Sequence, residues 1–119
     1  MDDEEVVRKL LTRMLPKLGF DVVCVGDGTA VLEAYQQAAA QARPFDVVIM
    51  DLTIPGGMGG KEAIQQLRVI DPQVKAIVSS GYSEDPVMAD HTAHGFCGVV
   101  AKPYTPEQFK SALDEILKT

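Results

Sequence analysis

The sequence has few of the residues that mark specialised small proteins: no tryptophan, three tyrosines, four phenylalanines and two cysteines among 119 residues. Cys24 and Cys97 lie far apart and lack the CxxC spacing of zinc and redox sites. This argues against a disulfide framework and predicts small buried thiols in a reducing compartment. No apolar run approaches the roughly 18 residues that cross a bilayer, and the N-terminus is acidic where a signal peptide is basic. We therefore expect no membrane-inserted segment.

Basic residues are in the minority, with 11 lysines and arginines against 17 aspartates and glutamates and a net charge of −6. Such a field repels phosphate backbones and anionic lipid surfaces, so the composition predicts no direct nucleic-acid binding and no membrane contact. The length, the hydrophobic content of 46% and the lack of repeats or linkers indicate one domain over residues 1–119.

Segments in which apolar residues have helical spacing alternate along the chain with short apolar runs typical of strands. Helical spacing covers residues 4–18, 29–41, 61–70, 84–95 and 105–117. Short apolar runs predict strands at 20–25, 46–50, 75–78 and 98–101. Strands that alternate with helices imply an α/β fold, a parallel sheet with helices on both faces. Five helices against four strands leave the count uneven, so a strand is expected to be missing before the first helix.

Turn and cap residues agree with these boundaries. Gly19 and Gly95 each follow a helix as expected of C-terminal caps. Thr105 and Gln108 form a capping box at the start of the last helix. The glycine-rich loop 55–60 matches neither phosphate-binding glycine pattern and is interpreted as a flexible turn.

Polar side chains gather where the predicted strands end and just before the first helix: Asp2, Asp3, Asp51, Ser79, Ser80 and Lys102. Ligands of open parallel sheets bind beyond the carboxyl ends of the strands. Carboxylates suit Mg²⁺, while lysine and serine bind phosphoryl oxygens. Each feature alone also has a structural explanation. The acidic pair could stabilise the positive end of a helix dipole, and Asp51 could form an Asx turn at the end of its strand. Their joint placement favours a site for a divalent cation and a phosphoryl group.

This ordered set resembles the receiver domain of two-component response regulators over the whole chain. The matching residues are the pair Asp2-Asp3, the DLTIP block that starts at Asp51, the pair Ser80-Gly81 and the run Lys102-Pro103-Tyr104. The amino-acid sequence of several segments is most similar to that of receiver domains attached to hybrid sensor histidine kinases. The resemblance implies a flavodoxin-like (CheY-like) doubly wound parallel sheet with strand order 2-1-3-4-5. The first strand of that sheet is missing from residues 1–119, so we expect this sequence to be an N-terminally truncated receiver domain.

The resemblance also assigns roles to residues. Asp51 is the phosphoacceptor, Lys102 pairs with phosphoryl oxygen, and Ser80 is the hydroxyl that turns toward the phosphoryl group. Mg²⁺ is held by four ligands: Asp2 through water, Asp3, Asp51 and the backbone carbonyl of Thr53. Pro103 is expected to follow a cis peptide bond.

The implied function is a phosphorelay switch. A histidine kinase or a histidine phosphotransfer domain donates the phosphoryl group, and the added charge changes the conformation of the helix 84–95 and the strand after it. The domain is expected to turn over no substrate beyond its own phosphorylation and dephosphorylation. It is expected in the cytoplasm, alone or as part of a membrane-anchored kinase, and is compatible with an oligomer.

Three departures from the family pattern carry expectations of their own. A missing first strand removes roughly five buried aliphatic side chains, on the order of 10 kcal/mol, so these residues alone are expected to form no stable monomer. Val99 stands where many relatives have an aromatic residue, which argues against propagation by a rotating aromatic ring. The loop after Pro55 has an extra glycine and lacks an acidic residue often found there.

Two other functions compete with this interpretation. A receiver-like module that binds partners without phosphorylation is the first, and the intact Asp51, Ser80 and Lys102 argue against it. The second is a phosphatase of the haloacid dehalogenase kind, which needs a second aspartate two residues after the nucleophile. Thr53 occupies that position.

Overall fold

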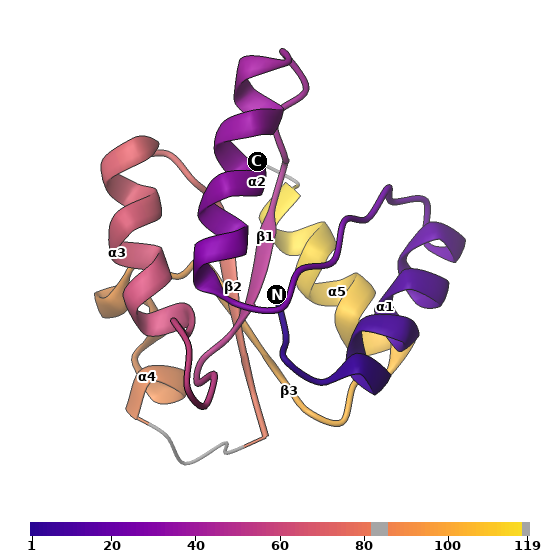
Figure 1. The fold of residues 1–119 in the computed structure, drawn as a ribbon. Coiled ribbons are helices and arrows are strands. Elements are labelled where there is room, and N and C mark those ends of the chain that lie inside the picture. Colours follow the sequence, from indigo (N-terminus) through magenta and orange to yellow (C-terminus); the bar gives the residue numbers. More distant parts are fainter. Residues whose placement is uncertain (82–85, 118–119) are drawn as a thin grey trace.

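The computed structural model describes residues 1–81 and 86–117. A parallel sheet lies at its centre (Figure 1), and its strands follow the order β1 (Val48–Asp51), β2 (Ala76–Ser80) and β3 (Gly98–Ala101). All five residues of the middle strand are buried, as expected of a strand covered on both faces. These strands match three of the four predicted ones.

Helices cover both faces of the sheet, so the predicted flavodoxin-like architecture is confirmed. One face carries α2 (Gly28–Ala40), α3 (Gly60–Ile70) and the short α4 (Pro86–Ala89), and the other carries α1 (Glu5–Lys17) and α5 (Pro106–Leu117) (Figure 1). None of the helices in the described ranges is long and apolar enough to cross a membrane.

Alternate residues of the middle strand feed two separate cores. The core under α2 and α3 contains Val31, Tyr35, Met50, Ile64, Leu67 and Val78. The core under α1 and α5 contains Leu11, Met14, Ile77, Val100, Phe109 and Leu113. The apolar stripes read from the sequence thus face the sheet, which explains why the long helices agree with their predicted bounds within one or two residues.

The predicted cap residues stop and start these helices. Gly19 follows α1 with a left-handed φ of +93°, and Gly95 adopts φ +96° after a 3-10 turn. Thr105 Oγ1 accepts a hydrogen bond from the backbone N–H of Gln108 at 3.2 Å and caps α5. Asp27 does the same for α2 by accepting from Ala30 N at 2.9 Å.

The predicted strand 20–25 is wrong: this segment belongs to no strand of the structure. A strand needs a neighbour along its length, and here Asp2 supplies one backbone bond, from its N–H to the carbonyl of Val25 at 3.1 Å. Met1 fills the space between that segment and β1, because its amine donates to Ile49 O at 2.6 Å and its carbonyl accepts from Asp51 N at 2.9 Å. The pairing thus exists only at the end of the segment nearest Asp51.

The predicted helix 84–95 is also corrected. Its first two residues lie outside the described residues, and the remainder forms two short pieces, α4 and the 3-10 helix η1 (His91–His94). Asp90 separates them with φ −128° and ψ 50°, outside the helical region. The expected conformational change of this segment stays a prediction.

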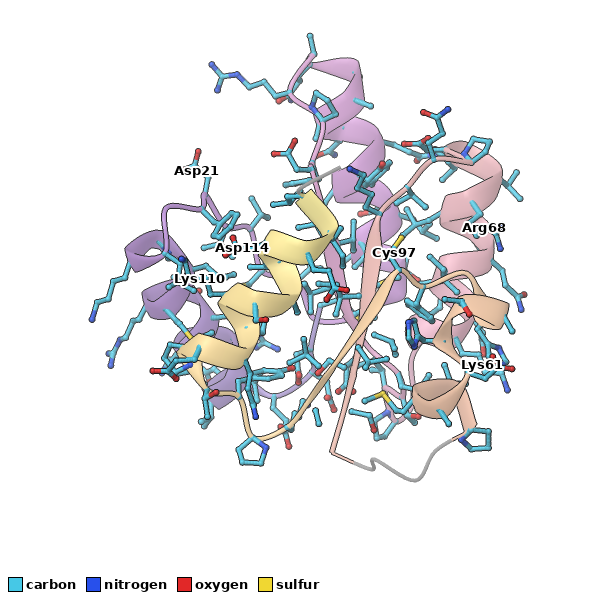
Figure 2. The ribbon with its side chains drawn as sticks, turned by 180° about the vertical axis from the view of Figure 1, so that it is seen from behind. Asp21, Lys61, Arg68, Cys97, Lys110 and Asp114 are labelled. Atoms are coloured by element: carbon cyan, nitrogen blue, oxygen red, sulfur yellow. The ribbon has the colours of Figure 1, made fainter. Side chains whose placement is uncertain are left out.

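The cysteines differ from their predicted burial. Cys97 is exposed just before β3 (Figure 2), because the neighbouring Phe96 takes the inward position and is only 2% exposed. Cys24 is half-buried, with its sulfur 3.4 Å from Thr12 Oγ1. The two thiols are free.

A buried tyrosine ties α2 to the loop after α3, and its removal tests this contact. Tyr35 donates a hydrogen bond to Asp71 Oδ2 at 2.6 Å, and burial together with this carboxylate raises the pKa of Tyr35 to about 12. We expect Tyr35→Phe to lower the free energy of unfolding by about 1 kcal/mol, the usual contribution of one such bond, measured by urea denaturation. Unchanged stability would show that water replaces the contact at no cost.

Candidate functional site

Asp51 is the last residue of β1 and lies at the carboxyl edge of the sheet, as predicted. Its side chain is 11% exposed. Its backbone N–H donates to Met1 O, and in the sheet it lies opposite Ser79 of the middle strand. The carboxylate of Asp51 is therefore attached to a backbone that is hydrogen-bonded on both sides.

The segment before α1 brings Asp2 to the same edge. Its N–H donates to Val25 O, its carbonyl accepts from Arg8 Nη1 at 2.8 Å, and its Oδ1 accepts from Glu4 N at 2.9 Å. Asp2 is 2% exposed. These bonds hold the carboxylate in place at the start of the helix, where the partial positive charge of the helix N-terminus also favours it.

Lys102 joins the two carboxylates. It follows β3, its N–H donates to Ser80 O at 3.0 Å, and the Lys102-Pro103 peptide bond is cis as predicted. Its Nζ lies 2.7 Å from Asp2 Oδ2 and 3.2 Å from Asp51 Oδ2. Glu4, which is largely exposed, lies 3.7 Å from the same ammonium.

The pKa values of Asp51 and Lys102 are both raised, but for different reasons. Burial raises the pKa of Asp51, and Asp2 and Asp3 add to that rise by repulsion, while Lys102 opposes it. Burial alone would lower the pKa of Lys102, but the carboxylates of Asp2 and Asp51 outweigh it and raise that pKa. Lys102 is therefore charged at neutral pH, and the carboxylate of Asp51 is ionised at an energetic cost.

The donor set fits a hard divalent cation. One carboxylate oxygen each from Asp2, Asp3 and Asp51 lies within 4.8 Å of the others. Asp2 Oδ2 is buried and accepts no well-aligned hydrogen bond from the described residues, so the nearby lysine meets it as an ion pair only. Thr53 follows Asp51 by two residues in the loop after β1, and its carbonyl as a fourth ligand stays a prediction.

The loop 55–60 forms a turn at Pro55 and Gly56, as predicted, and its last two glycines are closely packed. Gly59 and Gly60 are buried where the loop enters α3. A Cβ on Gly59 would lie 2.5 Å from the carbonyl oxygen of Leu52, and one on Gly60 would lie 2.7 Å from that of Asp51. These glycines let the backbone of the α3 N-terminus pack directly against the strand end that carries Asp51.

Ser79 and Ser80, at the end of β2, differ in their predicted roles and in their contacts. Ser80, the predicted switch hydroxyl, is 4% exposed at the end of β2, and its switching role stays a prediction. Ser79, which the sequence placed at the same strand end but to which the family resemblance gave no role, is fully buried and hydrogen-bonded to the hydroxyl of Tyr104. Glu4 was likewise not singled out, although its position beside the acidic pair was a usable signal.

Comparison with known proteins identifies the class. The model of the response regulator receiver domain family matches residues 1–114. The chemotaxis protein CheY of Thermotoga maritima is 30% identical over 118 residues, which cover 99% of this chain and 94% of that protein. The chain therefore belongs to the response regulator receiver domain family.

Two further relatives show where such domains occur. The sensor kinase CckA of Brucella abortus is 29% identical over 99% of this chain, which spans only 12% of that kinase. The receiver domain of a sensor histidine kinase from Pseudomonas aeruginosa PAO1, solved with magnesium in its active site cleft, has the same fold, with a TM-score of 0.81, 22% identity and coverage of 100% and 94% of the two chains. The protein is thus a phosphoacceptor signalling domain of two-component systems.

The contact between α3 and the strand end can be tested by adding one methyl group. We expect Gly60→Ala to destabilise the fold by about 1–3 kcal/mol, because the new Cβ must displace the carbonyl of Asp51, and this outweighs the gain in helix propensity. Gly26→Ala is the control, since its Cβ would meet only Arg8 Nη1 at 3.8 Å. Equal melting temperatures for the two variants would contradict the close packing.

The raised pKa of Asp51 predicts a pH-dependent stability. A carboxyl group whose folded pKa exceeds its unfolded value, roughly 4, holds its proton more tightly in the native state, so stability falls as pH rises through that window. We expect Asp51→Asn to be more stable than the wild type at pH 7, with the difference vanishing below the ordinary carboxyl pKa. Denaturant titrations between pH 3 and 8 measure it, and a wild type that is the more stable at pH 7 would refute it.

Proposed function

We propose that Asp51 is the residue that accepts the phosphoryl group, with Lys102 and a bound Mg²⁺ compensating charge. The observation that carries the proposal is the convergence on one sheet edge of Asp2, Asp51 and the partly buried ammonium of Lys102, whose Nζ lies 3.2 Å from Asp51 Oδ2. The domain then works in a phosphorelay, in the cytoplasm, with a phosphohistidine protein as donor.

The transfer step follows from the chemistry of the carboxylate. An Asp51 oxygen attacks phosphorus of a phosphohistidine, the P–O bond forms, and the P–N bond breaks with its electron pair left on the imidazole nitrogen. With a small acyl phosphate as donor, the leaving group is the carboxylate. Hydrolysis of the product returns Asp51 as a carboxylate.

Each residue of the site supports a different part of this step. Lys102 is already charged and adjacent to Asp51, so it can pair with a phosphoryl oxygen without gaining a proton. Ser80 at the end of the neighbouring strand is the hydroxyl that meets another phosphoryl oxygen. Asp2, Asp3, Asp51 and the Thr53 carbonyl would hold Mg²⁺, which supplies charge neutralisation at the transferred group.

The larger context is also part of the proposal. The chain matches a short part of a sensor kinase, 12% of the length of that kinase. The amino-acid sequence of the chain is most similar to receiver domains of hybrid sensor histidine kinases. We place it in a phosphorelay where a histidine kinase or a histidine phosphotransfer domain is the direct partner. The net charge of −6 argues against DNA or an anionic membrane as that partner.

The acceptor residue is tested by intact mass after incubation with Mg²⁺ and a small acyl phosphate. The wild type should gain one phosphoryl group, about 80 Da, in an acid-labile linkage of the acyl phosphate type. Asp51→Asn should gain none, and Lys102→Ala should gain it far more slowly. Asp46→Asn, an exposed aspartate before the opposite end of the same strand, is the matched control and should behave as the wild type. A mass gain that persists in Asp51→Asn would assign the acceptor elsewhere.

A further inference from the structure

A pair of hydroxyl groups, one on a buried serine and one on a half-buried tyrosine, lies beside the site and has no role in the function described above. The hydroxyl of Tyr104 is hydrogen-bonded to Oγ of Ser79, which is fully buried. The ring of Tyr104 packs edge-on against Phe109 of α5, with ring centroids 5.1 Å apart and an interplanar angle of 84°. Tyr104 therefore contacts the middle strand with its polar end and α5 with its ring.

The position of Ser79 makes this contact informative. In the sheet, Ser79 lies between Asp51 of β1 and Val100 of β3. The next residue, Ser80, accepts the backbone N–H of Lys102 at 3.0 Å. Two successive residues of the middle strand thus hold the loop between β3 and α5, one at Lys102 and one at Tyr104.

Lys102 depends on such support because it must reach the site from that loop. A lysine side chain is long and flexible, and its ammonium is a point charge without the rigid fork of arginine. Its Nζ is nevertheless placed between Asp2 and Asp51, at 2.7 Å and 3.2 Å. The backbone bond at Lys102 fixes where the side chain starts, and a second attachment two residues later limits the rotation of the loop.

We propose that Tyr104 is a positioning residue. The hydrogen bond between its hydroxyl and Ser79 holds the loop in the conformation that keeps the Lys102 ammonium next to Asp51. The inference rests on the proposed role of Asp51 and Lys102 and extends the site by one side chain from the loop and one from the middle strand. Burial raises the pKa of Tyr104, while Ser79 and Lys102 oppose the rise, so the hydroxyl keeps its proton at neutral pH and can serve as donor.

The first test compares two tyrosines whose hydroxyls are both hydrogen-bonded. Tyr104→Phe should lower the rate constant for phosphorylation by a small acyl phosphate about tenfold, since a slight misplacement of a catalytic group is enough for such a loss. Tyr35→Phe removes the Tyr35–Asp71 bond, on the far core and away from the acceptor, and should leave that rate constant unchanged. Equal rate constants for the two variants would overturn the proposal.

A double-mutant cycle separates positioning from a general loss of structure. If Tyr104 acts through Lys102, the tenfold effect of Tyr104→Phe should disappear when Lys102 is already alanine. The same tenfold loss in the Lys102→Ala background would show that the hydroxyl supports the fold of the site and not the lysine. Thermal unfolding of each variant, with Tyr35→Phe as reference, confirms that the compared proteins are folded.

Removing the serine hydroxyl distinguishes a lost attachment from a lone buried polar group. In Ser79→Ala/Tyr104→Phe neither partner is left unpaired, so stability should recover relative to Tyr104→Phe. The phosphorylation rate constant should nevertheless stay low, because the loop is still detached. A rate constant restored to the wild-type value would assign the defect to the orphaned Ser79 and reject positioning.

A measurement without any phosphoryl donor keeps this inference separate from the proposed function. Carbon-13 relaxation of the Lys102 ε-methylene should show a more mobile side chain in Tyr104→Phe than in the wild type or in Tyr35→Phe. If the wild type takes up no phosphoryl group, the assignment of Asp51 fails, and this relaxation result still decides the positioning claim. An ε-methylene equally ordered in all three proteins would overturn it.

Discussion

The partly buried ammonium of Lys102 organises the functional edge of this domain. Lys102 Nζ lies within 3.2 Å of carboxylates from the segment before α1 and from β1, while its own backbone is attached to β2. Parts of the chain that are about 50 and 100 residues apart in sequence thus meet around one charge. The cluster places acidic groups close together in a partly buried setting, and such an arrangement is tolerated because the lysine is among them.

The local elements of the fold were accessible from the sequence because their signals are local. The helices at 29–41, 61–70 and 105–117 carry an apolar stripe together with start or stop residues, and the structure confirms them within one or two residues. Asp51 and Lys102 were accessible for a related reason: each ends a short apolar run, and parallel strands bring such ends to one edge. The family resemblance then added roles that spacing alone does not define.

Three of the features that sequence reasoning missed depend on distant parts of the chain. The residues 20–25 have strand composition, but a strand exists only if a neighbour supplies hydrogen bonds along it. The close packing of Gly59 and Gly60 depends on the carbonyls of β1, and the Tyr104–Ser79 pair joins residues 25 positions apart. No local pattern carries these contacts.

The charge balance of the site explains how a small chemical event there is transmitted. Three carboxylates and one ammonium leave two negative charges uncompensated, which a divalent cation would neutralise. Under the proposed function, a phosphoryl group on Asp51 would add charge at the atom that faces Lys102, and the lysine would follow the new oxygens. Because the backbone of Lys102 is bonded to Ser80 and Tyr104 is bonded to Ser79, any shift of the lysine acts on the end of the middle strand and, through Phe109, on α5. Val99 stands on β3 where many relatives have an aromatic residue, and within the described residues the contacts of Tyr104 provide a route from the Asp51 edge of the sheet to α5.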